Sequence, residues 1–520
     1  EGEQVALEEP VVAQGNIEDW LNMLKTEMQR TLKSIVRGMA SNILSVFAEN
    51  DKEKFESFIQ NHPAQVGILG IQFYWTAMSE EALTRAKTEK SALSQVAKNF
   101  AKALSQLVEF TTKKLTSTER TAIETLITIH IHQVDISLEL MKSRLKSPED
   151  FEWLKQTRLY WRPDIDDTVI AITDVDFLYQ YEYLGVAERL VITPLTDRIY
   201  ISCSQAMNMY YGSAPAEPAG TGKTETTKDM GRTCGRFFVT INCSDQMDYR
   251  AMGKMYKGIA QSGIWCGFDE INRIDLAVLS VVAAQIACVF NALKERKMEF
   301  TFVDGTTIPL THTAGIFVTM NPGYAGRTEL PENMKALFRT IAVVVPDRQI
   351  ICRVRLAASG FQENELLAKK FFTLYRLCEE QLSKQVHYDF GLRNILSVLR
   401  TCGSQKRTRP NDSETHVLMR VLRDMNLSKL VDEDEPLFLS LVGDLFPGID
   451  VEKQNYPDLQ AELAKGVADL GIINTSGWNL KVIQIYEQYQ VRHGLCIMGP
   501  SGSGKSSAIK VLGKALYALE

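Results

Sequence analysis

The first 150 residues carry a helical pattern of hydrophobic positions. From Trp20 onward apolar residues recur every three or four positions, and the members of this series are Leu21, Leu24, Met28, Leu32, Ile35 and Met39. A second series runs from Leu83 through Val96 and Phe100 to Leu107. This spacing puts the apolar side chains on one face of a helix. Because glycine and proline are scarce here, the pattern predicts a set of long amphipathic helices.

The pattern changes between residues 151 and 200. A turn signal at Arg162, Pro163 and Asp164 is followed by short apolar runs at 168–172 and 190–192, which predict strands. From there to about residue 447, predicted strands alternate with helices, with a loop at 404–412. This alternation is typical of an α/β fold whose parallel sheet is covered on both faces.

A complete phosphate-binding motif, G-x-x-x-x-G-K-[ST], lies near the end of the sequence. Its residues are Gly499, Pro500, Ser501, Gly502, Ser503, Gly504, Lys505 and Ser506. The apolar run 495–498 predicts a strand before it, and 507–519 predict a helix after it, which is the context the motif requires. Glycines let backbone N–H groups face phosphate oxygens, the lysine adds charge, and the Ser506 hydroxyl ligates Mg²⁺.

A second, earlier loop has most of the same motif. Its residues are Pro218, Ala219, Gly220, Thr221, Gly222, Lys223, Thr224 and Glu225. The opening glycine is replaced by Glu217. A carboxylate there would repel phosphate or distort the turn. The remaining glycines, Lys223 and Thr224 still predict a nucleotide site.

Two carboxylates follow the apolar run 263–268. Asp269 and Glu270 stand 269 − 223 = 46 residues beyond Lys223. Asp269 would hold Mg²⁺ through water, and Glu270 would orient or deprotonate the attacking water. Such a pair is common in isolation, but after a phosphate-binding loop it predicts ATP hydrolysis.

Three further residues are candidates for the same site. Asn321 follows the apolar run 315–320, and it would emerge at the carboxyl edge of the sheet to hold water or the γ-phosphate. Asn-Pro-Gly alone is also an ordinary turn. Arg339 lies between a predicted helix at 331–338 and a predicted strand at 341–345, and Arg393 lies farther along. Each arginine is either catalytic or an ordinary surface residue.

Composition limits the possible partners and surroundings. The 520 residues are enough for roughly three domains. The net charge is −6 and no dense Lys/Arg tract is present, which disfavours nucleic acid and anionic membranes as partners. The apolar stretch 277–293 contains polar residues and is short for a membrane span, so we interpret it as a core helix. The sequence ends 520 − 505 = 15 residues after Lys505, so a longer protein is expected.

Cysteines and histidines give no metal motif. Nine scattered cysteines without a C-x-x-C pair, in a chain that does not begin like a secretory signal, favour a reducing compartment and buried thiols. His130 and His132 have no obvious third ligand, so packing is preferred over metal binding.

Four ordered segments resemble the first AAA+ module of dynein heavy chains. They are Pro-Ala-Gly-Thr-Gly-Lys-Thr-Glu-Thr at 218–226, Asn-Cys-Ser-Asp-Gln-Met-Asp-Tyr at 242–249, Phe-Asp-Glu-Ile-Asn-Arg at 268–273 and Asn-Pro-Gly-Tyr-Ala-Gly-Arg at 321–327. The second is similar to axonemal rather than cytoplasmic dyneins, with an outer-arm type preferred. The resemblance implies that residues 1–165 are the C-terminal part of a helical linker. It further implies that 166–447 are an AAA+ P-loop module with a parallel sheet and helical lid, and that 448–520 begin a second module.

The resemblance also implies roles for individual residues. Lys223 and Thr224 would hold phosphates and Mg²⁺, Asp269 would support the metal, and Glu270 would activate water. Asn321 would be the sensor-1 residue, Arg393 the sensor-2 arginine, and Arg339 an arginine finger directed at a neighbouring module. Two positions depart from the family pattern, namely Glu217 and the order Cys266-Gly267.

The implied function is that of an ATP-hydrolysing motor segment that uses ATP/ADP and Mg²⁺ in the axoneme of a cilium or flagellum. The implied partners are other AAA+ modules of the same heavy chain, dynein intermediate and light chains, and microtubules through a stalk outside this sequence. Two alternatives remain: a structural nucleotide-binding module with impaired hydrolysis, and a midasin-type remodelling ATPase. The helical residues before 165 and the run 242–249 argue against the latter.

Overall fold

The computed structural model describes residues 2–48, 52–89, 91–111, 113–143, 145, 147–216, 222–320, 329–409, 412–449, 456–491 and 494–519. It divides into two compact units, Glu1–Asp347 and Arg348–Glu520, which are described separately. The division falls where the α/β region gives way to helices. The linker and module borders implied by the resemblance, near 165 and 447, remain a proposal.

The first unit begins with the predicted long helices. They are α1 (Ile17–Ala48), α2 (Lys52–Asn61), α3 (Ala64–Arg85), α4 (Ala92–Phe110) and α5 (Ser117–Lys142). Leu32 and Met39 on α1 are buried as predicted, whereas Leu21 at its start is 46% exposed. The helix α5 begins with a capping box in which Thr116 and Glu119 satisfy each other's backbone N–H groups.

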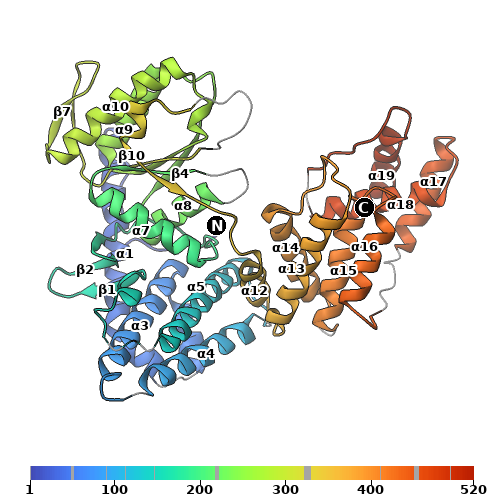
Figure 1. Ribbon diagram of the computed structural model, residues 1–520, viewed down its shortest axis with the longest axis horizontal. Helices are drawn as coiled ribbons and strands as arrows, with labels where there is room; N and C mark the ends of the chain where they lie inside the picture. Colours follow the sequence, from blue (N-terminus) through green and yellow to red (C-terminus); the bar gives the residue numbers. More distant parts are fainter. Residues whose placement is uncertain are drawn as a thin grey trace. The chain divides into compact units, whose positions relative to one another are not determined.

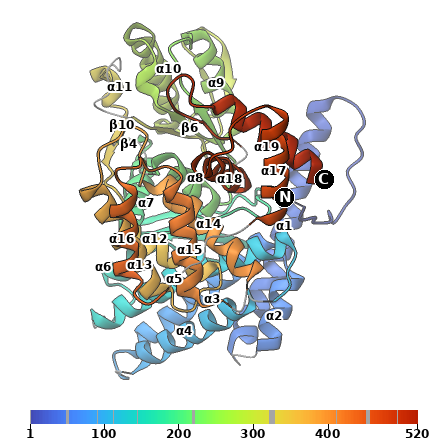
Figure 2. The same ribbon diagram turned by 90° about the vertical axis from the view of Figure 1, so that its right-hand side faces the viewer.

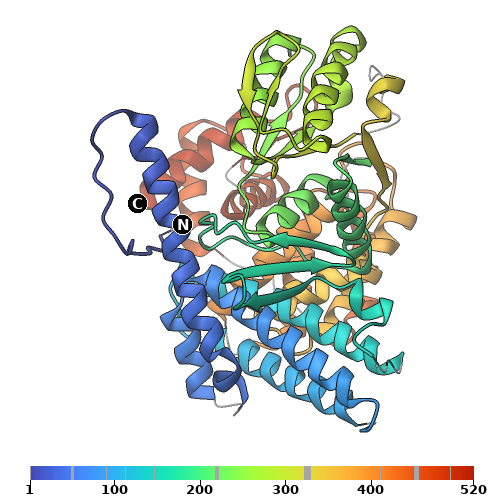
Figure 3. The same cartoon turned by 90° about the vertical axis from the view of Figure 1, so that its left-hand side faces the viewer.

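A small antiparallel sheet follows the helices. After the short helix α6 (Phe151–Leu154), strands β1 (Arg158–Arg162), β2 (Asp167–Ile172) and β3 (Val175–Leu178) pair in the order β1-β2-β3. Figure 3 shows these teal strands beside the blue helices, and the Leu159 N–H of β1 donates to the Thr76 hydroxyl of α3 at 3.3 Å. The strand predicted at 168–172 is confirmed.

The second strand predicted in this region is wrong. Residues 190–192 lie in a segment, 179–193, that has no regular secondary structure. The Leu190 N–H donates to the Asp229 carboxylate at 3.2 Å rather than to a neighbouring strand. A side chain therefore takes the place that a sheet partner would have filled.

The centre of the first unit is the predicted parallel sheet. Its strands are β4 (Gly212–Ala216), β5 (Phe238–Asn242), β6 (Trp265–Asp269), β9 (Gly315–Val318) and β10 (Phe338–Ala342), in the spatial order β10-β4-β9-β6-β5. The other elements are α7 (Pro194–Asn208), α8 (Lys223–Thr233), α9 (Tyr249–Ser262), η1 (Ile271–Arg273), α10 (Leu276–Lys294), α11 (Glu332–Lys335) and the hairpin β7 (Glu299–Thr301) and β8 (Thr307–Pro309). Figure 1 shows α7 and α8 on one side of the sheet and α9 and α10 on the other.

The last strand corrects one boundary. Residues 341–345 were expected to form it, but β10 pairs from Phe338 to Ala342 in parallel register with β4. The helix expected at 331–338 is accordingly reduced to α11. Arg339 therefore lies within a strand rather than before one.

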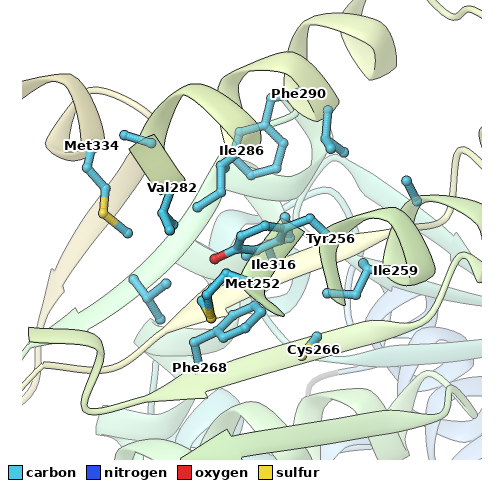
Figure 4. Close-up of a cluster of buried hydrophobic side chains, with 14 of the residues drawn as sticks. Met252, Tyr256, Ile259, Cys266, Phe268, Val282, Ile286, Phe290, Ile316 and Met334 are labelled. Carbon is cyan, nitrogen blue, oxygen red and sulfur yellow. The ribbon is translucent and has the colours of Figure 1, made fainter. Parts of the chain in front are cut away.

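Alternation along the strands fills both faces of this sheet. Phe268 and Ile316 pack with Tyr256 and Ile286 from α9 and α10, as Figure 4 shows. Trp265 and Phe317 face α7 and α8 instead. Neighbouring residues on a strand point to opposite faces, which explains this division. At Gly267 an added Cβ would lie 2.9 Å from the Phe238 ring, so the Cys266-Gly267 order suits this packing.

The core helix predicted at 277–293 corresponds to α10. Among the described residues, α10 is the one helix long and apolar enough to cross a membrane. Half of its most apolar stretch is buried inside the protein. Leu279, Ile286 and Val289 lie in the core over the sheet. These contacts support the interpretation as a core helix.

Most of the cysteines, and His130 of the histidine pair, occupy packed positions. Seven cysteines are buried, as predicted for apolar thiols: Cys203, Cys234, Cys243, Cys266, Cys352, Cys378 and Cys402. His130 is buried, and its Nε2 lies 2.9 Å from the Phe100 carbonyl oxygen. Burial lowers the pKa of His130. Within the described residues, no group of three or more His, Cys, Asp or Glu side chains is arranged to hold a metal.

The described residues of the second unit form helices joined by loops, and they contain no strand. Its helices are α12 (Arg348–Ala358), α13 (Asn364–Gln381), α14 (Leu392–Thr408), α15 (Glu414–Leu427), α16 (Glu435–Leu445), α17 (Pro457–Asp469), α18 (Ser476–Val491) and α19 (Lys505–Leu519). Figure 2 shows α13 to α16 as a bundle, whose core includes Phe371, Leu399 and Phe438. The strand and helix alternation expected as far as 447 is therefore wrong beyond β10, although a helical lid was expected.

Two local expectations in this unit are also wrong. The loop expected at 404–412 is helical as far as Thr408, because Lys406 and Arg407 in the last turn of α14 complement the helix dipole. Residues 495–498 do not form a strand. The described residues of this unit contain no strand, so the backbone of 495–498 has no sheet partner among them.

Candidate functional site

The helix α8 starts at the earlier phosphate-binding loop. Gly222 precedes it with φ of 86°, a left-handed conformation that glycine adopts without a steric penalty. Lys223, the first residue of α8, is buried, and its Nζ donates to the Met320 carbonyl oxygen at 2.8 Å. Glu217, Pro218, Ala219, Gly220 and Thr221 lie outside the described residues. Glu225 follows in the first turn of α8.

An oxygen cluster brings the loop and the acidic pair together. The Thr224 hydroxyl donates to Asp269 Oδ1 at 2.9 Å, and the Thr319 hydroxyl donates to the same oxygen. A hydroxyl and a carboxylate beside a phosphate-binding loop are the donors that Mg²⁺ uses together with water and phosphate oxygens. The residues present therefore fit the predicted metal.

Glu270 has an unusual backbone conformation. Its φ of 54° and ψ of 45° are left-handed, which costs energy for a residue with a Cβ atom. The Glu270 N–H donates to the Thr319 hydroxyl at 3.1 Å, and the carboxylate forms an ion pair with Arg273. The Glu270 side chain is 24% exposed, so a water molecule can reach it. The two adjacent carboxylates have different partners, because Asp269 accepts from Thr224 and Thr319 while Glu270 pairs with Arg273.

Thr319 is a site residue that the sequence analysis missed. It is buried and contacts both members of the acidic pair. The parallel register pairs Phe268 with Val318, so Thr319 lies level with Asp269 at the carboxyl edge. A hydroxyl directly after an apolar strand was the available signal.

The remaining candidates lie in different places. Asn321 is outside the described residues. Arg339 is exposed on β10, where it pairs with Ser213 of β4. Arg393 belongs to the second unit, is exposed near the start of α14, and lines a cavity of about 700 Å³ within that unit. The structure thus joins Lys223, Thr224, Asp269 and Glu270 at one edge of the sheet.

The second phosphate-binding loop folds around its own lysine. Lys505 opens α19, and its Nζ donates to the carbonyl oxygens of Gly499 and Pro500 at 2.8 and 2.7 Å. Gly502 and Gly504 have φ of 82° and 80°. The Ser503 hydroxyl donates to the Pro500 carbonyl oxygen at 2.9 Å. This positive-φ loop at a helix N-terminus is suited to an anion.

Together, the parallel sheet, the loop before α8 and the oxygen cluster define a P-loop nucleotide-binding module. The family model described as "Hydrolytic ATP binding site of dynein motor region" matches residues 179–506. The chain belongs to this dynein motor family, and a nucleotide-binding site lies within the matched region.

Three similar proteins are dynein chains, two of them named axonemal and one named for the flagellar outer arm. The chain is 57% identical to mouse dynein axonemal heavy chain 5 over 516 residues, and 57% identical to human dynein axonemal heavy chain 8 over 518 residues. It is 54% identical over 520 residues to the Chlamydomonas reinhardtii dynein gamma chain, flagellar outer arm. These matches cover 99%, 99% and 100% of this chain, and 11% of each relative. The chain thus spans about a tenth of the length of these curated relatives.

Proposed function

We propose that this chain is the ATP-hydrolysing segment of an axonemal dynein heavy chain. In this proposal residues 1–165 are linker, 166–447 are the first AAA+ module, and 448–520 begin the second. The observation that carries the assignment is the contact between Thr224 and Asp269 beside Glu270. The test is a single-turnover measurement of ATP hydrolysis by the heavy chain, and hydrolysis should be lost when Glu270 is substituted.

Each residue of the site has a separate role. Lys223 exchanges its bond to the Met320 carbonyl for phosphate oxygens, while Thr224 and Asp269 provide the metal's protein oxygens. Mg²⁺ held by these two residues would supply positive charge to offset the charge that develops on the phosphates. Glu270 is the base that accepts the proton of the attacking water. Its carboxylate is paired with Arg273, so this ion pair has to open before the carboxylate can accept the proton.

Three further residues take part in hydrolysis in this proposal, of which Arg339 serves a neighbouring module. Asn321 holds the attacking water as sensor 1, and Arg393 binds the γ-phosphate as sensor 2. Arg339, exposed on the edge strand β10, is the finger for a neighbouring module. Their assignment rests on the motif positions.

The motor function extends beyond this segment. ATP hydrolysis would move the linker and drive sliding on microtubules, which bind through a stalk outside residues 1–520. The partners are then the other AAA+ modules, dynein intermediate and light chains, and microtubules, in the axoneme of a cilium or flagellum. The axonemal and flagellar outer-arm names of the relatives support this location and the outer-arm type.

Glu217 motivates the alternative, a structural module with impaired hydrolysis. If its carboxylate points to solvent, Glu217→Gly should tighten ATP binding by less than about tenfold, since only the backbone cost at the turn is removed. Titration with a fluorescent ATP analogue measures this change. A gain of about a hundredfold or more would mean that the carboxylate faces the phosphates and that the native site is disabled.

Lys505 tests the second loop separately. Lys505→Ala should remove one bound nucleotide per purified heavy chain, because the loop loses the ammonium around which it folds. Hydrolysis at the first site should persist in this variant. Exposed Lys510 on the same helix provides the control, and Lys510→Ala should leave the nucleotide count unchanged. An unchanged count in Lys505→Ala would show that the loop holds no nucleotide.

A further inference from the structure

Residues 179–193, called the strap here, connect β3 to α7 without regular secondary structure. Loops of this length within a compact unit are uncommon and are usually functional. Part of the strap is buried, since Tyr179, Tyr181, Arg189 and Val191 are each 3% to 7% exposed. A buried irregular segment needs specific partners for its backbone.

The partners of the strap lie mainly at the C-terminal end of α8. The N–H groups of Gln180 and Glu182 donate to the carbonyl oxygens of Cys234 and Gly235 at 3.2 and 3.0 Å. The Tyr179 ring lies so close to Gly235 that an added Cβ would meet it at 2.4 Å. The strap therefore encloses the end of α8 opposite the nucleotide-binding residues.

A buried ion pair fixes the middle of the same helix. Arg189 donates from Nε and Nη2 to the two oxygens of Asp229 at 2.6 and 3.0 Å, and both side chains are under 10% exposed. Tyr200 of α7 donates to Asp229 at 2.6 Å, and Arg189 also donates to the Thr233 hydroxyl at 2.5 Å. Burial opposes the charged form, yet Arg189 keeps the pKa of Asp229 below its usual value. A bidentate pair of this kind fixes the orientation of the two side chains as well as the distance between them.

The other side of the strap is held mainly by Gln65 of the helical region, with a longer bond at 3.5 Å from the Thr125 hydroxyl of α5 to the Ala187 carbonyl oxygen. Gln65 of α3 donates to the Tyr179 hydroxyl at 2.6 Å and to the Glu182 carbonyl oxygen at 2.8 Å. Its amide oxygen accepts from the Leu184 N–H at 3.0 Å. Gln65 is 5% exposed, so its amide is used inside the protein to join α3 to the strap.

We propose that the strap sets the position of α8, and that Arg189, Asp229 and Tyr200 are positioning residues for the nucleotide held by Lys223 and Thr224. This inference rests on the proposed ATPase function. Because α8 is a single rigid helix from Lys223 to Thr233, a shift at Asp229 moves the phosphate-binding end. Gln65 makes the same site respond to the position of α3.

The test uses Tyr200→Phe, which removes one buried hydroxyl without removing either charge. Tyr375→Phe is the matched control, because its buried hydroxyl donates to Asn426 in the second unit. In the full heavy chain, Tyr200→Phe should raise KM for ATP by about threefold or more with a smaller change in kcat, because small displacements of binding groups are costly. Tyr375→Phe should change KM by less than about twofold while lowering the melting temperature similarly.

Gln65→Met provides a second, independent variant. It should also raise KM, and the double variant with Tyr200→Phe should be non-additive because both act through the strap. KM values of both single variants equal to that of Tyr375→Phe would overturn the inference. Lys223→Ala in the Lys505→Ala background, which removes binding at the second loop, is measured in parallel and separates the two proposals. ATP binding retained in that variant contradicts the ATPase assignment. ATP binding lost in that variant, together with a normal KM in Tyr200→Phe and Gln65→Met, contradicts only the role of the strap.

Discussion

Replacing Glu270 by glutamine should leave ATP bound and uncleaved in the heavy chain. The amide keeps the size of the side chain but cannot accept the proton of the attacking water. Loss of a general base slows proton transfer by about 10²- to 10⁴-fold. The substitution leaves Lys223, Thr224 and Asp269, the proposed binding residues, unchanged. Rapid-quench measurement of a single turnover should therefore show slow product formation together with stable ATP binding.

The matched control is Glu299→Gln. Glu299 is exposed on the hairpin strand β7, away from the carboxyl edge of the parallel sheet. Glu299→Gln changes the net charge of the protein by the same amount as Glu270→Gln, and the single-turnover rate of Glu299→Gln should equal that of the wild type. A normal single-turnover rate in Glu270→Gln would remove Glu270 from the role of base.

Replacing Lys223 by alanine should weaken ATP binding by about a hundredfold or more. An ammonium about 4 Å from a phosphate charge contributes on the order of 4 kcal/mol at an effective dielectric of 20, part of which offsets the lost bond to Met320. A fluorescent ATP analogue titrated in the Lys505→Ala background measures the first site without the second loop.

Lys228→Ala provides the control on the same helix. Lys228 pairs with Glu225 at 2.9 Å, more than one turn beyond the phosphate-binding end of α8. Its removal should leave ATP affinity within about twofold, because a surface ion pair contributes little. Equal affinities of the Lys223→Ala and Lys228→Ala proteins would contradict the proposed phosphate site.

The parts of the fold predicted correctly are those in which local pattern and tertiary packing agree. The apolar runs around Phe268 and Phe317 became central strands because both faces of each strand are buried. The end of β10 was misplaced because Val344 and Val345 are apolar yet 64% and 57% exposed. Apolar character alone does not tell where strand pairing ends.

The missed features depend on contacts between distant parts of the sequence. Thr319 lies next to Asp269 only because of strand register, although 50 residues separate them. Residues 190–192 look like a strand but lie against α8, where Asp229 supplies the hydrogen-bond acceptor. No local propensity encodes either contact.

The candidate site residues could be proposed from the sequence because their chemistry limits the choice of side chain. A phosphate-binding loop needs glycines and a lysine, and a metal site needs oxygen donors. These requirements pointed to Thr224 and Asp269 separately, whereas the contact between them and the pairing of Glu270 with Arg273 are seen only in the structure.

The central claim is that Lys223, Thr224 and Asp269 hold the nucleotide that Glu270 hydrolyses. A density map of the intact heavy chain carrying Glu270→Gln, frozen with Mg²⁺ and ATP, tests it most directly. The claim predicts triphosphate density at the start of α8, with the Lys223 ammonium on the phosphates and the Thr224 hydroxyl turned from Asp269 toward a metal. Nucleoside diphosphate there, or Lys223 still bonded to the Met320 carbonyl with no phosphate beside it, would contradict the claim.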